Sequence, residues 1–312
     1  MDTAVFHPGE QALQQRSGVR ERLAAVGPVV MRDHMPDQHR ELFGKLPTLL
    51  VAVQDDQGQP WATMLHGPAG FITSPDPTTL AVAALPAADD PVTPWLTPGA
   101  AVGALGLEPH TRRRNRANGR VRALHPTGFE LQVLQSFGNC PKYIHGREPQ
   151  SLPARAVPAA QRLAPALNPE ALALVRRADT LFIASASGAQ PGSARAEGVD
   201  VSHRGGPPGF VHVSATLQGL RLTLPDYQGN FFFNTLGNLQ VWPLAGLLVP
   251  DYRDGSLLHL AAKASIEFDA AALAAFPGAQ RLLHLDVRGA WWRPQALPLR
   301  WSAPEAPPQF GS

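Results

Sequence analysis

The chain is poor in cysteine and in charge, and each shortage excludes a class of protein. Cys140 is the only cysteine among 312 residues, which excludes an internal disulfide framework and a cysteine-rich zinc site. Charged residues make up 17% of the chain, below the roughly 25% of an average soluble protein, so long solvated helices are not expected. With 27 basic and 25 acidic residues the net charge is +2, and nothing in this balance directs the chain to nucleic acid.

Several familiar sequence signals are also missing. The opening segment MDTAVFHPGEQ has no apolar core of a signal peptide, and no stretch approaches 18 apolar residues. We therefore expect a cytoplasmic protein that does not enter a membrane. The chain has no GxGxxG motif after a strand, no GxxxxGK[ST] and no GxSxG, which argues against a Rossmann site, a P-loop and a serine hydrolase. Without an HExxH motif or a Cys/His cluster, no metal site is expected.

Glycine and proline are abundant instead, with 28 and 32 residues. The frequent turns that they impose, together with an apolar fraction of 44%, predict a mainly β fold with short helices. At roughly 150 residues per domain, the length predicts two domains.

Short similarities recur about 140 residues apart. The run LPTLLVAV ends at Val53 and resembles ADTLFIAS, which ends at Ser185, and each follows a predicted helix. GPAGF ends at Phe71 and resembles GPPGF, which ends at Phe210. A repeat of this length indicates duplicated domains rather than a solenoid, whose periods are roughly 20 to 50 residues.

Later positions extend the repeat. Gly103 and Gly246 stand at similar places in the two halves, and Arg120 follows the first glycine at the spacing with which Lys263 follows the second. We predict a first domain over residues 1–145, a proline-rich linker over 146–168 and a second domain over 169–312. Hairpin signals such as Asp254-Gly255 favour small antiparallel barrels, and two like barrels can pack as a pseudo-dimer.

Two segments of the second half favour the binding of a phosphorylated ligand. The segment 225–238 contains the amides and hydroxyl of Asn230, Asn234, Thr235 and Asn238, and such loops bind phosphate where a helix begins. The alternative is an ordinary turn before a capped helix, with the phenylalanines in the core. The segment 200–210 places an arginine beside serine and histidine in a glycine-rich turn, either as an anion clamp or as a plain surface turn.

Together the segments DVSHRGGPPGF, LRLTLPDYQGNFFFNTLGNLQVWPLAGLLV and LLHLAAKA resemble the pyridoxamine 5′-phosphate oxidase-like split-barrel flavoproteins. The resemblance implies two tandem six-stranded split β-barrels packed as a pseudo-dimer, with FMN bound in the second. It also implies a set of cofactor-binding residues in the second half. These are Ser202, His203, Arg204, Asp226, Asn230, Asn234, Thr235 and Asn238.

One departure from the family concerns positive charge at the phosphate. Many relatives have arginines after the Gly-Asn pair, where this chain has Phe231 and Phe232. We predict that Arg112, Arg114 and Arg116 replace them from a hairpin of the first half. The alternatives are a solvated basic turn and a patch that binds nucleic acid nonspecifically.

Residues that close the first half give weaker signals. Lys142 is a further candidate for contact with the flavin, whereas Cys140 is interpreted as a structural cysteine because no base stands near it in the sequence. The counterpart of the phosphate loop in the first half, Leu85–Pro91, is acidic. One FMN per chain is therefore expected, with the first barrel as a lapsed partner.

The predicted function is that of an FMN-dependent oxidoreductase, in which hydride passes through flavin N5. The catalytic residues and the small-molecule substrate are not identified, and the electron donor is either NAD(P)H or a partner reductase. A homodimer is expected, and nucleic acid is not expected as a partner. The alternatives are a non-enzymatic flavin- or haem-binding protein and a duplicated barrel without a cofactor.

Overall fold

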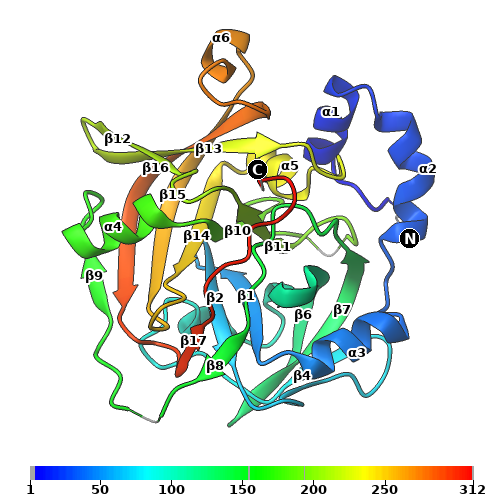
Figure 1. Cartoon of the computed structure of the whole chain (residues 1–312). Coiled ribbons are helices and arrows are strands. Elements are labelled where there is room, and N and C mark those ends of the chain that lie inside the picture. Colours follow the sequence, from blue (N-terminus) through cyan, green and yellow to red (C-terminus); the bar gives the residue numbers. More distant parts are fainter. Residues whose placement is uncertain (1–3, 154, 193, 311–312) are drawn as a thin grey trace.

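The computed structural model describes residues 4–153, 155–192 and 194–310. It confirms a mainly β chain with antiparallel sheets and few helices (Figure 1). The elements of the first half are α1 (Pro8–Arg16), α2 (Arg20–Val30), α3 (Asp37–Lys45), β1 (Thr48–Gln54), β2 (Pro60–His66), β3 (Ile72–Thr73), β4 (Thr79–Val82), η1 (Thr93–Trp95), β5 (Ala101–Glu108), η2 (Pro109–Thr111), β6 (Arg113–His125) and β7 (Gly128–Gly138).

The second half follows two short strands that lie in the predicted linker. The remaining elements are β8 (Pro149–Ser151), β9 (Gln161–Leu163), α4 (Pro169–Arg177), β10 (Thr180–Ala186), β11 (Val199–Gly205), β12 (His212–Thr216), β13 (Gly219–Tyr227), α5 (Asn234–Val241), β14 (Leu244–Pro250), β15 (Leu257–Glu267), α6 (Ala270–Leu273), β16 (Ala279–Arg293) and β17 (Leu299–Trp301).

Local sequence explains where the helices begin. In α4 the side chain of Asn168 accepts a hydrogen bond from the Ala171 N–H, and Pro169 occupies the first turn, where its missing N–H costs nothing. In α1 the His7 side chain accepts from the backbone while the Glu10 carboxylate accepts from the His7 N–H, a reciprocal capping box. Such caps fix the start of a helix from a few neighbouring residues.

The two large sheets have the same strand order. The first runs β2-β1-β5-β6-β7-β4-β3, and the second runs β11-β10-β14-β15-β16-β13-β12, with β9 added beside β16. Each strand of one sheet therefore has a counterpart at the same place in the other, so the repeat in the sequence is also a repeat of the fold. The first sheet has seven strands and the second has eight with β9, whereas six were predicted for each barrel; the two tandem barrels stay a prediction.

The repeated turns agree in detail. In GPAGF and GPPGF the N–H of the phenylalanine, Phe71 or Phe210, donates to the carbonyl of the proline three residues earlier at 2.9 Å. The glycines before them, Gly70 and Gly209, have φ of 87° and 85°. This left-handed backbone strains any residue with a side chain, so both copies of the turn require glycine.

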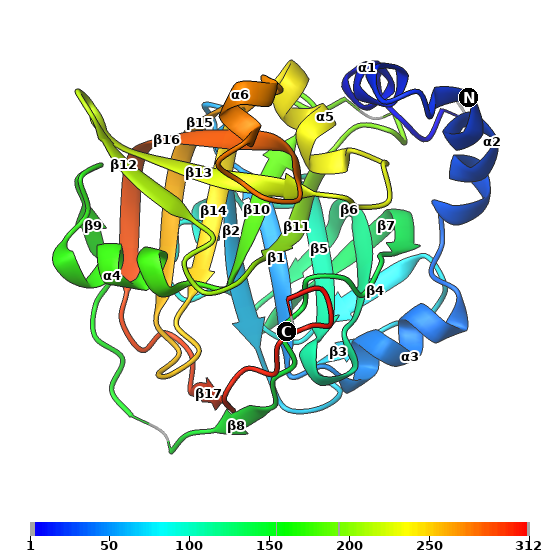
Figure 2. The ribbon, with the colours of Figure 1, turned by 45° about the horizontal axis from the view of Figure 1, so that its top comes forward.

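The halves contact each other through reciprocal pairs of strands. Gly103 in β5 faces the backbone of β11, where a Cβ on it would lie 2.8 Å from Asp200 Cα. Gly246 in β14 faces the backbone of β2, where a Cβ would lie 2.2 Å from the Pro60 carbonyl oxygen. Because β5 corresponds to β14 and β11 to β2, the same surface is used twice, as in a symmetric dimer. These strands run through the middle of the molecule (Figure 2).

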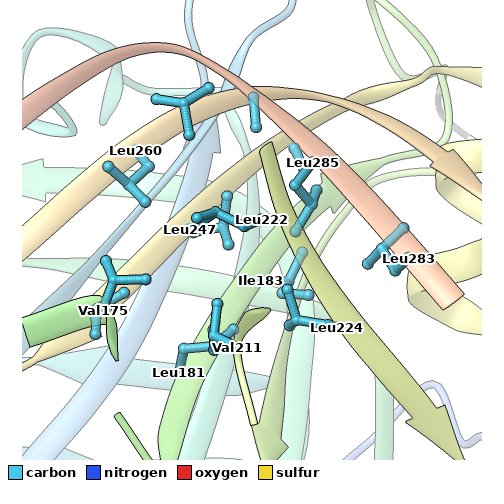
Figure 3. Packing of buried hydrophobic residues seen from close by; sticks show 14 of the residues in the cluster. Val175, Leu181, Ile183, Val211, Leu222, Leu224, Leu247, Leu260, Leu283 and Leu285 are labelled. Atoms are coloured by element: carbon cyan, nitrogen blue, oxygen red, sulfur yellow. The ribbon is translucent and has the colours of Figure 1, made fainter. Parts of the chain in front are cut away.

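The apolar core has three main parts. One lies within the first half and one within the second, where Leu181, Leu222, Leu247 and Leu285 meet between the strands (Figure 3). The third part joins the halves. It includes Leu50, Met64 and Leu105 from the first half and Phe182, Val201 and Leu248 from the second.

The predicted linker is not without structure. Within residues 146–168, β8 pairs with β17 and β9 pairs with β16, so the segment contributes strands to two sheets. The predicted domain boundaries remain a prediction. No helix in the described residues is long and apolar enough to cross a membrane.

We expect Gly246→Ala to destabilise the fold, because its Cβ would collide with backbone that cannot move aside. The free energy of unfolding should fall by about 2 kcal/mol or more, the range of overpacked sites. Urea denaturation measures it. Gly289→Ala is the control, since nothing lies within 4 Å of a Cβ at that position. Equal stability of the two variants would contradict the close packing of the strands.

Candidate functional site

A cavity lies where the two halves meet, and it encloses about 930 Å³ of atom-free space, including open solvent at its mouth. Its walls come from β11, the end of β13, the loop before α5 and the first turn of α5, together with β6 and the segment after β7. The predicted residues that line it are Arg114, Arg116, Lys142, Ser202, His203, Arg204, Asp226, Asn230, Asn234 and Thr235.

Two predicted residues do not line this cavity. Arg112 stands in a left-handed turn with φ of 57°, and its guanidinium pairs with Glu305 at 2.8 Å. Asn238 lies one helical turn after Asn234 on α5, and its side-chain amide donates to the Ser185 hydroxyl at 3.0 Å. Asn238 lines a smaller polar cavity beside the first.

Arg114 and Arg116 reach the second half because residues two apart in a strand share a face. Arg116 pairs with Asp200 at 2.7 Å and also donates to the side chains of Ser202 and Asn139. Arg114 donates to Nδ1 of His203 at 2.9 Å. Among the described residues Arg114 has no carboxylate partner, and its Nε makes no hydrogen bond. Burial, with Arg116 and Arg204 adding to it, lowers the pKa of Arg114 to about 9.

His203 is held as a neutral imidazole. A guanidinium can only donate, so Nδ1 of His203 accepts from Arg114 and Nε2 carries the proton. That Nε2 is buried and makes no hydrogen bond within the described chain. Burial, followed by the charge of Arg114, holds the pKa of His203 well below its ordinary value. The ring is therefore a hydrogen-bond donor rather than a charge.

The first turn of α5 supplies more polar groups. The Thr235 hydroxyl donates to the Ser202 hydroxyl at 2.7 Å, and Ser202 donates to the Asp200 carboxylate at 2.9 Å. No side chain caps the start of α5, which follows Phe233. An uncapped helix start presents free N–H groups and a partial positive charge, which favour an anion.

Aromatic and ionic residues form the outer part of the cavity. Arg204 and Arg281 both pair with Asp226, at 3.0 Å and 3.5 Å. Tyr143 stacks on Tyr227 with ring centroids 5.3 Å apart. Sequence reasoning missed Arg281, although it pairs with Asp226 in the register of β13 and β16, because no motif marks it.

Backbone strain is concentrated in the same place. Tyr143, Phe231 and Phe233 line the cavity with φ of 67°, 63° and 65°. Bulky residues rarely adopt left-handed backbone, and such strain is often found at binding and active sites.

The N-terminal helix α1 holds the loop before α5 in place. The Asn234 side chain donates to Glu10 at 2.6 Å, and the Gln14 side chain donates to the Phe232 carbonyl at 3.2 Å. Glu10 is fully buried, which raises its pKa to about 8. Sequence reasoning missed Glu10, because its partner Asn234 is 224 residues away in the chain.

Neither a protein-family model nor a curated protein matches the chain. Parts of the structure are similar to a predicted pyridoxamine 5′-phosphate oxidase from Lactobacillus delbrueckii, with 16% identity and a TM-score of 0.29 over 40% of this chain and 93% of that one. The haem storage protein HutZ from Vibrio cholerae shares 14% identity, with a TM-score of 0.27 over 41% and 94%. An FAD-binding protein from Mesorhizobium loti shares 9% identity, with a TM-score of 0.27 over 43% and 97%. Similarities this weak assign no family, and the resemblance inferred from the motifs stays a prediction.

Glu10→Gln tests the buried carboxyl. An unfolded chain loses this proton near pH 4.3, whereas the folded chain keeps it to about pH 8. Between these values the folded state binds the extra proton, so the contribution of Glu10 to wild-type stability falls as pH rises, by up to about 1.4 kcal/mol per pH unit. The variant should lack this contribution, and urea unfolding at several pH values measures it.

The control is Glu21→Gln on the exposed face of α2, which should keep the wild-type slope. A wild-type slope that Glu10→Gln also retains would contradict the raised pKa.

Proposed function

We propose that the chain binds FMN in the cavity between its halves and acts as a flavin-dependent oxidoreductase, built from two tandem split barrels. The observation that carries the proposal is the excess of positive charge on the walls of the cavity. Five cations line the cavity, namely Arg114, Arg116, Lys142, Arg204 and Arg281, whereas Asp226 is the carboxylate that lines it with them.

The inner part of the cavity fits a phosphate. The Arg114 guanidinium has a free Nε, the His203 ring has a free Nε2–H, and the Thr235 hydroxyl lies at the start of a helix. A phosphate carries a charge of about −1.5 to −2 at pH 7 and accepts several hydrogen bonds. Bound there, it would complete the hydrogen bonds of buried donors and offset the charge of Arg114, which has no carboxylate partner in the described chain.

The outer part of the cavity fits a planar ring. The side chains of Tyr143, Tyr227, Phe231 and Phe233 line it, and aromatic walls of this kind bind ring systems by packing and stacking. The cavity therefore combines donors that suit a phosphate with aromatic walls that suit a ring, as a ligand with a phosphate at one end and a ring at the other requires.

Bound flavin would supply hydride transfer through N5. The chain itself would contribute binding and orientation. Arg114 and Arg116 would fix the phosphate, and the aromatic residues would fix the ring plane. His203 stays neutral and already accepts from Arg114, so it would donate a hydrogen bond through Nε2 rather than exchange a proton.

Electrons would come from NAD(P)H or from a reductase partner, and the substrate would be a small molecule that reaches the outer cavity. Two chains would pair as a homodimer. A haem-binding role is the alternative, but the tautomer of His203, which lines the cavity with its proton on Nε2 and with Nδ1 accepting from Arg114, offers no free nitrogen to iron. The visible absorption spectrum of the purified protein separates a flavin from a haem.

Arg114→Met should raise the Kd for FMN at least tenfold, because a charge-assisted hydrogen bond to phosphate is worth about 1.5–3 kcal/mol. Quenching of flavin fluorescence measures the affinity. Riboflavin, which lacks the phosphate, should bind wild type and variant almost equally. This comparison distinguishes loss of a phosphate contact from damage to the ring pocket.

The matched control is Arg113→Met, one residue away on the opposite face of β6. Arg113 does not line the cavity, and it contacts the Gln38 carbonyl at 3.5 Å. Its loss should leave the FMN affinity unchanged. A wild-type chain that binds no flavin, or equal affinities of the two variants, would overturn the proposal.

A further inference from the structure

The correspondence between the two sheets extends to single residues around the cavity. The registers of β1–β2 and β10–β11 make Ala62 the counterpart of Val201 and Thr63 the counterpart of Ser202. The registers of β5–β6 and β14–β15 make His259 the counterpart of Arg116. The site described above therefore has a counterpart in the first half, at the opposite side of the contact between the sheets.

A pair of hydrogen bonds confirms this correspondence. In the second-half site the Arg116 Nε donates to the Val201 carbonyl at 3.3 Å. In the first-half counterpart the His259 Nδ1 donates to the Ala62 carbonyl at 2.8 Å. Arg116 and His259 each reach from their own half to a backbone carbonyl of the other half, and the two carbonyls, of Val201 and Ala62, are counterparts. The two sites are therefore built from corresponding contacts.

The first-half place is filled by a carboxylate of the chain. Asp90 accepts from the Thr63 hydroxyl at 2.5 Å, from Arg293 at 2.6 Å and from the Val92 N–H at 2.9 Å. Val92 is the N-cap of η1, which follows the fourth strand as α5 does in the second half. The Asp90 carboxylate thus accepts hydrogen bonds from a hydroxyl, a guanidinium and a backbone N–H. Donors of these kinds also line the cavity described above.

Three other cavity residues have apolar counterparts. Leu257 stands where the second-half site has Arg114, Met64 stands for His203, and Leu65 stands for Arg204. All three are buried in the core. At the first-half counterpart, buried apolar side chains therefore replace the polar lining of a large ligand site, and only the position of the anion is kept.

One buried donor remains free beside Asp90. The Arg293 Nε makes no hydrogen bond within the described residues, and Arg293 is 5% exposed. Donors of this kind normally have an acceptor. The cluster therefore has more donor capacity than the Asp90 carboxylate uses.

We propose that the first half retains the anion position of the duplicated site, and that the Asp90 carboxylate is its permanent occupant in place of a ligand. With the Asp90 side chain removed, the position takes a small carboxylate such as formate. A second consequence, one external anion per chain, rests on the proposed function. At the cavity, Ser202 and Arg116 are paired with Asp200, and the donors left for the phosphate of a ligand are the Arg114 Nε and the His203 Nε2 beside them.

Chemical rescue of Asp90→Ala tests the proposal. The variant leaves Arg293 buried without its closest partner, so its Tm should fall by several degrees. Sodium formate at about 100 mM should raise that Tm by about 3 °C or more beyond potassium chloride of the same ionic strength. Wild type should show no such difference, because its own carboxylate fills the position.

Asp89→Ala is the matched control. Asp89 also pairs with Arg293, at 3.1 Å, but its side chain is 43% exposed. This variant should gain nothing specific from formate. An equal response of Asp90→Ala, Asp89→Ala and wild type would overturn the proposal.

A second variant keeps the proposal testable if Asp90→Ala does not fold. In Asp90→Ala/Arg293→Leu the unpaired cation is gone, so the double variant should fold and should not respond to formate. An insoluble single variant whose fold Arg293→Leu does not restore would contradict the proposal. Flavin titration of the wild type decides the proposed function separately, since the formate response of Asp90→Ala requires no cofactor.

Discussion

The structure depends on the direct backbone contact between its halves. Gly103 and Gly246 let β5 lie on β11 and β14 lie on β2 without side chains between them. Because β6 is hydrogen-bonded to β5, this contact also sets the distance between the arginines of β6 and the second half. Arg116 can then reach the Val201 carbonyl and the Asp200 carboxylate. The cavity is a consequence of this packing, since its two walls belong to different halves.

The same contact has opposite electrostatic consequences at its two ends. At the cavity it leaves Arg114 half-buried without a carboxylate partner, and burial lowers the pKa of that group to about 9. At the first-half counterpart of the cavity, Leu257 takes the place of Arg114, and the Asp90–Arg293 pair completes the site within the chain. A desolvated cation destabilises a fold until an anion joins it. The counterpart site therefore has the arrangement that stability favours, whereas the cavity keeps a cation without a carboxylate.

The sequence revealed the parts of the fold that depend on neighbouring residues. Pro169 after an asparagine predicted the start of α4, and the spacing of Gly103 and Gly246 predicted the repeat. The site was harder to predict, because alternation places side chains on one face only within the strand, and β6 begins after Arg112. Arg114 enters the cavity, whereas Arg112 lies in the turn before the strand and pairs with the C-terminal segment. Arg281 was missed because only the register of two distant strands brings it to Asp226.

Duplication within one chain explains how the two sites diverged. In a symmetric homodimer each residue occupies both copies of a site, so a substitution that fills one copy fills the other. In a fused chain the counterparts change independently, as Arg116 and His259 have done. One copy can then bury a permanent ion pair and stabilise the contact between the halves, while the other keeps unpaired donors. The free Nε of Arg114 and the free Nε2 of His203 therefore belong to the copy of the site that has an open cavity.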